Sequence, residues 1–197
     1  MTSATEGNGR GNLLRMAGWG TAAALVLLPL VAMRLTDEVK WTGGDFVFAI
    51  VLIGSVGVAL ELAVRMTSNR LCRAGAALAL GAAFAMMWIN GAVSILGDDA
   101  SRAKPLFLIV TIVAIGGAAL ARLRPAGMAR AMAATAAAQA AIPLIAQLAG
   151  IGVGAGPDVA KAALLTTGFV ALWLAAGWLF ARAEQGLPKQ PVQDVST

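Results

Sequence analysis

The chain has 197 residues, of which 59% are hydrophobic and 13% charged, and its formal net charge is +5. Soluble domains are about 45–50% apolar and about 25% charged, and a soluble monomer of this size could not bury so much apolar surface. Disorder is excluded because disordered chains are poor in apolar residues. The composition therefore predicts an integral membrane protein.

Two residue types are missing from the sequence, and their absence narrows the possible chemistry. The chain contains no His and no Tyr, and Cys72 is its single cysteine. This excludes His-ligated metal sites, catalysis by a His base and an intramolecular disulfide. We find no pairing of a nucleophile with a base, so we expect no enzyme activity, no metal site and no cofactor.

Six apolar segments follow one another along the chain. Crossing about 30 Å of hydrocarbon takes about 20 mainly apolar residues, and the segments lie at 14–33, 46–65, 71–96, 105–121, 131–151 and 162–181. They have the length of helices and lack the alternation of barrel strands. We therefore predict an all-α, six-transmembrane-helix bundle over 13–182, with disordered tails at 1–12 and 183–197.

The first and fifth segments differ from the others in what precedes or interrupts their apolar residues. In the first, Arg10 and Arg15 precede the apolar stretch and no small-residue cleavage site is present, so we interpret this segment as a retained anchor and not as a signal peptide. The fifth is built on Ala and contains Gln139, Pro143 and Gln147. Because Ala is close to neutral for insertion, we expect this segment to enter the membrane as a hairpin with the fourth.

The charged residues predict the orientation of the bundle. The two tails and the second and fourth linkers, counted together with the ends of the spans that adjoin them, carry ten of the fifteen basic residues and four of the ten acidic ones. Cationic loops stay in the cytoplasm, so both termini are expected there. No basic patch is interleaved with aromatic residues, so the positive charge indicates topology and not nucleic-acid binding.

One acidic and three amide side chains lie within the predicted spans. Glu61 is in the cytoplasmic half of the second span, where an ionised group costs about 2.5–3.5 kcal/mol. It is expected either to carry a proton or to pair with Arg65, one turn away. The amides of Asn90, Gln139 and Gln147 either join the helices by hydrogen bonds or, with Glu61, line a polar cavity between the second, third and fifth spans.

Several short pieces of the sequence, in their order, resemble small six-helix inner-membrane proteins of bacteria that have no assigned function. The pieces are Gly44-Asp45-Phe46, Glu61-Leu62, the run from Trp88 to Val93 and the run from Arg124 to Arg130. They extend over most of the membrane region. The resemblance implies a bacterial inner membrane and brings no activity with it.

Two classes of function are compatible with these features. The first is a transporter or channel-like protein for a small solute or ion, with Glu61 as the ionisable residue within the membrane. The second is a non-transport accessory or lipid-interacting subunit, present as a homo-oligomer or with another membrane protein. In that case basic linker residues would contact anionic headgroups or an acidic partner, namely Arg70, Arg73, Arg122, Arg124 and Arg130.

Overall fold

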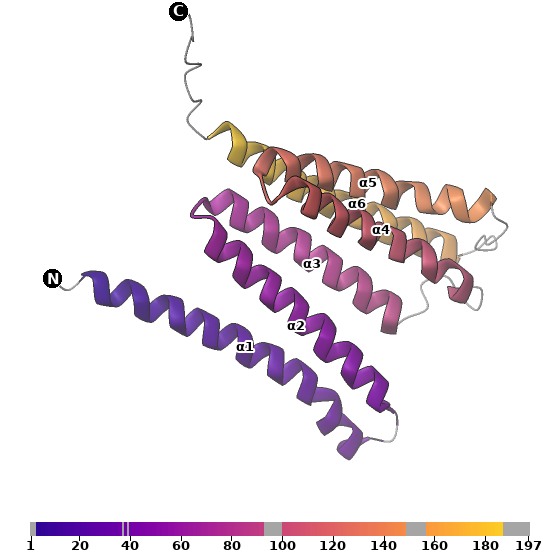
Figure 1. Cartoon of the computed structure of the whole chain (residues 1–197). Helices are drawn as coiled ribbons and strands as arrows, with labels where there is room; N and C mark the ends of the chain where they lie inside the picture. Colours follow the sequence, from indigo (N-terminus) through magenta and orange to yellow (C-terminus); the bar gives the residue numbers. More distant parts are fainter. Residues whose placement is uncertain (1–2, 37, 39, 93–99, 149–156, 187–197) are drawn as a thin grey trace, which may run out of the picture. The chain divides into compact units, whose positions relative to one another are not determined.

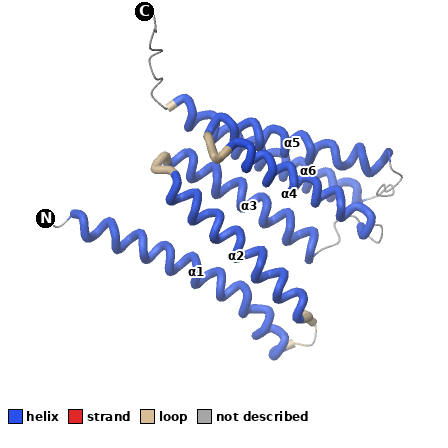
Figure 2. The backbone as a smooth tube through the Cα atoms, in the orientation of Figure 1, coloured by secondary structure: helices blue, strands red, loops and turns tan. Residues whose placement is uncertain are grey.

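The computed structural model describes residues 3–36, 38, 40–92, 100–148 and 157–186. These residues form six helices and no strand, as Figures 1 and 2 show. In chain order the helices are α1 (Ser3–Leu35), α2 (Gly43–Met66), α3 (Arg70–Ala92), α4 (Ala100–Ala121), α5 (Pro125–Leu148) and α6 (Pro157–Gln185). The all-α prediction is confirmed for this part of the chain.

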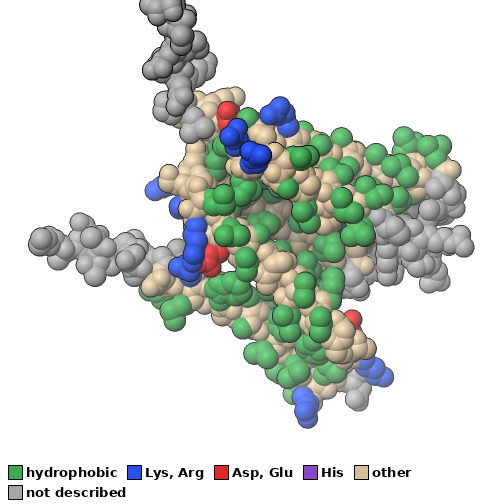
Figure 3. All heavy atoms as spheres, in the orientation of Figure 1, with side chains coloured by type: hydrophobic (Ala, Val, Ile, Leu, Met, Phe, Trp, Pro, Cys, Tyr) green, Lys and Arg blue, Asp and Glu red, His purple; other side chains and the backbone are tan. Residues whose placement is uncertain are grey.

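Five of the helices are long and apolar enough to cross a membrane. The apolar stretches are Arg15–Leu35, Gly43–Met66, Arg70–Asn90, Pro125–Leu148 and Ala160–Gln185, whereas that of α4, Leu106–Ala121, is shorter. Each helix overlaps one predicted segment. Figure 3 shows hydrophobic side chains along the helices and Lys and Arg side chains near their ends.

The helices extend beyond several of the predicted boundaries. Helix α1 begins at Ser3 and α6 ends at Gln185, so both include residues that we had assigned to the tails. Residues 93–96 and 149–151, at the ends of the third and fifth predicted spans, lie outside the described residues, as do 1–2 and 187–197.

The chain divides into two compact units, Met1–Leu62 and Ala63–Thr197. The first unit, here called the N-terminal hairpin, contains α1 and most of α2. A β-carbon on Gly57 would lie 3.2 Å from the ring of Trp19, so this side chain of α1 reaches across to α2 at Gly57. Helices α1 and α2 run antiparallel, as Figure 1 shows, and Trp19 lies level with Gly57.

The second unit, here called the four-helix unit, is built from α3 to α6. Helix α5 packs against α4 and α6, and α3 packs against α6 and α4. Its core includes the fully buried side chains of Met86, Val110 and Trp173. In lipid, close packing through small residues drives helices to associate, whereas in water hydrophobic burial does so.

Glycines mark the closest helix contacts of this unit. A β-carbon on Gly117 of α4 would lie 2.8 Å from the Cβ atom of Ala131 on α5. One on Gly177 of α6 would lie 3.3 Å from the Cβ atom of Met132. These contacts fix how far each helix is shifted along its neighbour.

A tight turn joins α4 to α5. Arg122 and Leu123 both have left-handed backbone angles, with φ of 47° and 57°. The N–H of Arg124 donates to the carbonyl of Ala121 at 2.9 Å. A β-carbon on Gly127 would lie 2.8 Å from the Cβ atom of Ala121, so the turn needs glycine there to bring α5 back against α4.

We predict that Gly117→Ala lowers the free energy of unfolding by about 1–3 kcal/mol, because α4 and α5 must move apart to admit the new methyl group. Unfolding in detergent micelles, followed by circular dichroism, measures this change. Gly116→Ala is the matched control, since its β-carbon would meet no described atom within 4 Å. Equal stability of the two variants would show that the α4–α5 contact is loose.

Candidate functional site

Glu61 is bound by two side chains from α1. The guanidinium of Arg15 donates to Oε1 of Glu61 and forms an ion pair with it. The indole Nε1 of Trp19 donates to Oε2 at 3.4 Å. Arg15 and Trp19 are one turn apart on α1, so both face the same position on α2. The Glu61 side chain is 21% exposed, and Arg15 supplies a positive charge beside its carboxylate.

Arg15 is a partner of Glu61 that the sequence pattern did not predict. The signal was present, because Arg15 begins the apolar stretch of α1 and Glu61 lies five residues before the end of α2. Antiparallel neighbours place such residues at the same level. The expected pairing of Glu61 with Arg65 is not tested by these contacts and stays a prediction.

Gln139 is the second unusual polar side chain. It lies on α5 with 0% exposure, and neither its amide nitrogen nor its amide oxygen has a hydrogen-bond partner among the described residues. Trp173 of α6 is 1% exposed, and its Nε1 also has no hydrogen-bond partner among the described residues. Each unsatisfied buried group costs about 1–3 kcal/mol, so these atoms call for an explanation.

The helix contacts place Gln139 and Trp173 close to one level of the four-helix unit. Gly177 of α6 is in contact with Met132 of α5. Trp173 lies four residues before Gly177, and Gln139 lies seven residues after Met132, which is the same direction along the bundle because the two helices are antiparallel. At about 1.5 Å per residue, their levels differ by about 4–5 Å along the bundle. Thr135, one turn from Gln139, is also fully buried and donates to the carbonyl of Ala131 at 2.8 Å.

The other two amides have different surroundings. Asn90 is half-buried and its Nδ2 donates to the carbonyl of Met86 at 2.8 Å, within its own helix. Gln147 is exposed on α5. Eight residues separate it from Gln139, which is about 12 Å along a helix. Within the four-helix unit, therefore, the structure does not bring the three amides together.

Basic residues gather at one end of the four-helix unit, where α3 and α5 begin and α6 ends. Gly75 of α3 is in contact with the ring of Phe180 on α6, which places these ends side by side. Helix α5 begins at the same end, because a side chain from the last turn of α6 reaches its first turn. The basic residues there are Arg70, Arg73, Arg122, Arg124, Arg130 and Arg182.

Two of the contacts at this end are structural. Arg73 donates from Nε to the carbonyl of Thr67 at 2.8 Å and from Nη2 to that of Val64 at 3.0 Å, so it closes the α2–α3 linker. Oε2 of Glu184 accepts from the N–H of Ala126 at 3.1 Å, so it caps the start of α5. A carboxylate is favourable at a helix N-terminus. Glu184 thus lies in the last turn of α6, whereas the sequence places it in the C-terminal tail predicted at 183–197.

The described residues contain no candidate metal site, and comparison with known proteins identifies no functional site. Among the residues that the structure describes, no three His, Cys, Asp or Glu side chains are grouped to hold a metal ion, and Cys72 is buried and free. No protein-family model, curated protein or solved structure matches the chain.

We predict that Arg15 and Glu61 are energetically coupled. In a double-mutant cycle of Arg15→Gln and Glu61→Gln, the coupling energy is expected to be about 0.2–1 kcal/mol, the range for partly exposed ion pairs. Unfolding in detergent measures it. Arg34→Gln, at the opposite end of α1, is the control and should combine additively with Glu61→Gln. Additivity of the Arg15 and Glu61 variants would show that the pair contributes nothing.

Proposed function

We propose that the chain is a multi-pass protein of a bacterial inner membrane, with six spans and both termini in the cytoplasm. Five sufficiently long apolar helices support membrane insertion. The basic end of the four-helix unit supports the orientation, because arginines from several separate segments lie together there and cationic segments stay in the cytoplasm. Helix α4, with the shorter apolar stretch, is paired along its length with α5.

This topology predicts the behaviour of reporter fusions in a bacterium. Alkaline phosphatase fused after Thr197 should be inactive, because its disulfides form only outside the cytoplasm, whereas green fluorescent protein at the same site should fluoresce. Alkaline phosphatase fused after residue 156, in the linker before α6, should be active. Activity of the phosphatase after Thr197 would contradict a cytoplasmic C-terminus.

Within this membrane protein, we propose transport of a small solute. The supporting observation is the amide of Gln139, which is fully buried and unpartnered in the middle of α5. A polar group in a membrane interior is costly, and in such proteins it commonly serves a pathway. The described buried side chains of the four-helix unit include two polar ones, Gln139 and Thr135, and no charged one. These surroundings favour an uncharged solute that exchanges hydrogen bonds with the amide.

The alternative within the transport proposal is that an ion is transported and that Glu61 is the residue it contacts. Glu61 is an ionisable group in the apolar α2. Its ion pair with Arg15, however, equally supports a role in holding α1 against α2. The geometry therefore favours Gln139 over Glu61 as the residue that a solute would contact.

The transport proposal predicts solute flux that depends on Gln139. Proteoliposomes should take up glycerol or urea faster than empty liposomes, as measured by stopped-flow light scattering after an osmotic step. Gln139→Leu should abolish the difference while raising the free energy of unfolding by about 1–3 kcal/mol, since it removes the unsatisfied amide. The matched control, Gln147→Leu, replaces an exposed glutamine on the same helix and should leave flux unchanged.

An accessory subunit is the second candidate function. The observation in its favour is the close packing of the four-helix unit, where Gly117 and Ala131 leave no room for a methyl group between α4 and α5. If the purified wild-type protein carries neither glycerol nor urea and elutes with another membrane protein in fixed ratio, the accessory function is supported and the transport proposal for these solutes is wrong.

A further inference from the structure

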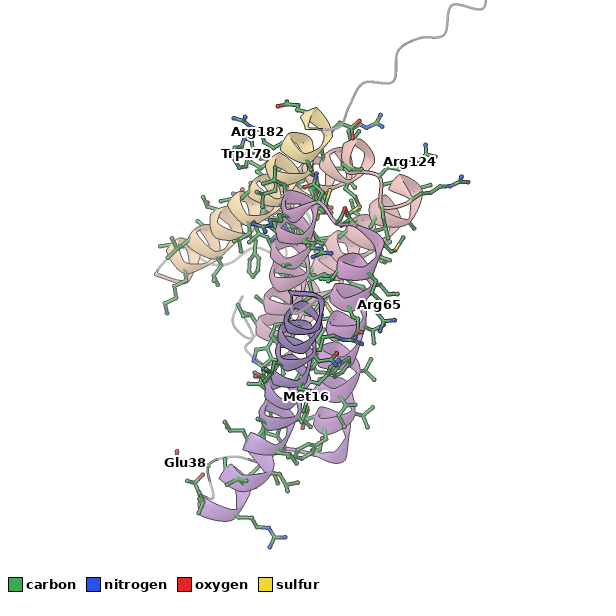
Figure 4. All side chains as sticks on the ribbon, turned by 90° about the vertical axis from the view of Figure 1, so that its left-hand side faces the viewer. Met16, Glu38, Arg65, Arg124, Trp178 and Arg182 are labelled. Carbon is green, nitrogen blue, oxygen red and sulfur yellow. The ribbon has the colours of Figure 1, made fainter. Side chains whose placement is uncertain are left out.

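The outer face of α6 carries an exposed apolar stretch that ends in a cation. Leu174, Trp178 and Arg182 follow one another at intervals of four residues, so they lie on one face of the helix. Leu174 is 52% and Trp178 57% exposed, and Arg182 is exposed as well. Figure 4 shows Trp178 and Arg182 projecting from the outer side of α6. We call these three residues the α6 outer face.

The Arg182 guanidinium lies over the indole ring of Trp178, and its positive charge is available to a ligand. Its Cζ atom lies 5.1 Å from the centre of the Trp178 ring, which is a cation–π contact. The nearest acidic residue along α6, Glu184, directs its carboxylate to the N–H of Ala126. Arg130, which is exposed, belongs to the same end of the unit and adds to the positive potential there.

The order of the three side chains matches the layers of a lipid leaflet. Arg182 lies three residues before the end of the apolar stretch Ala160–Gln185. If this stretch spans a bilayer, its end lies at the level of the headgroups. Trp178 lies about 6 Å deeper, where indole rings favour the interface. Leu174 lies a further turn inside. A phospholipid presents its phosphate, glycerol and acyl chains in the same order.

We propose that the α6 outer face binds one anionic phospholipid, with the phosphate on Arg182 and an acyl chain along Trp178 and Leu174. A planar guanidinium donates two parallel hydrogen bonds to phosphate oxygens, which a Lys side chain cannot do. A net negative headgroup such as phosphatidylglycerol is favoured over phosphatidylcholine, because the surrounding arginines repel the choline cation. The inference depends on a position in the membrane and not on any transport activity.

Native mass spectrometry of the detergent-purified protein, titrated with phosphatidylglycerol or phosphatidylcholine, tests this proposal. We expect the protein to retain phosphatidylglycerol preferentially. Arg182→Gln should weaken its binding about fivefold, the factor for one basic residue near an anionic surface. Trp178→Ala should weaken it as well, and Arg182→Lys should restore only part of the affinity. All of these positions are exposed, and circular dichroism checks that the variants fold.

The matched control is Arg124→Gln, which removes the same charge from the same end of the unit. Arg124 is exposed in the α4–α5 turn, on the opposite side from Arg182 in Figure 4. It should leave phosphatidylglycerol binding within about twofold of wild type. Equal weakening by Arg124→Gln and Arg182→Gln would overturn the proposal in favour of a diffuse charge effect. Wild-type affinity in Arg182→Gln, or equal retention of the two lipids, would overturn it outright.

Discussion

The four-helix unit depends on the close approach of its helices at small residues. Lipid tails are as apolar as leucine, so the hydrophobic effect gives membrane helices no reason to associate. Gly117 against Ala131 and Gly177 against Met132 allow backbones to come close enough for dispersion contacts and for one fixed register. That register determines which side chains share a level, including the buried Gln139 and Trp173.

The helices could be predicted from the sequence because membrane crossing needs long apolar segments and the linkers here are short. The partners of individual polar residues could not, because they depend on which helices pack together. Glu61 illustrates this: Arg65 is near it in sequence, whereas Arg15 reaches it only once α1 and α2 are antiparallel neighbours. Polarity marked Asn90, Gln139 and Gln147 equally, yet packing buries one fully, half-buries another and exposes the third.

The two polar centres differ in how their groups are satisfied, and this difference suggests different roles. Glu61 has a cation and an indole donor, which is the arrangement of a group that stabilises a helix pair. The Gln139 amide and the Trp173 indole have no such partners among the described residues. Buried groups of this kind are retained at a cost in stability, and function is the usual reason for that cost.

The Glu184 carboxylate caps the first turn of α5, although it is synthesised well after that turn. Helix α5 begins at Pro125, but the carboxylate that accepts from the N–H of Ala126 belongs to a residue translated 58 positions later. Until the end of α6 has left the ribosome, the first turn of α5 must rely on water or headgroups for that hydrogen bond. The last turn of α6 thus completes the hydrogen bonding of a helix whose first turn was synthesised 58 residues earlier.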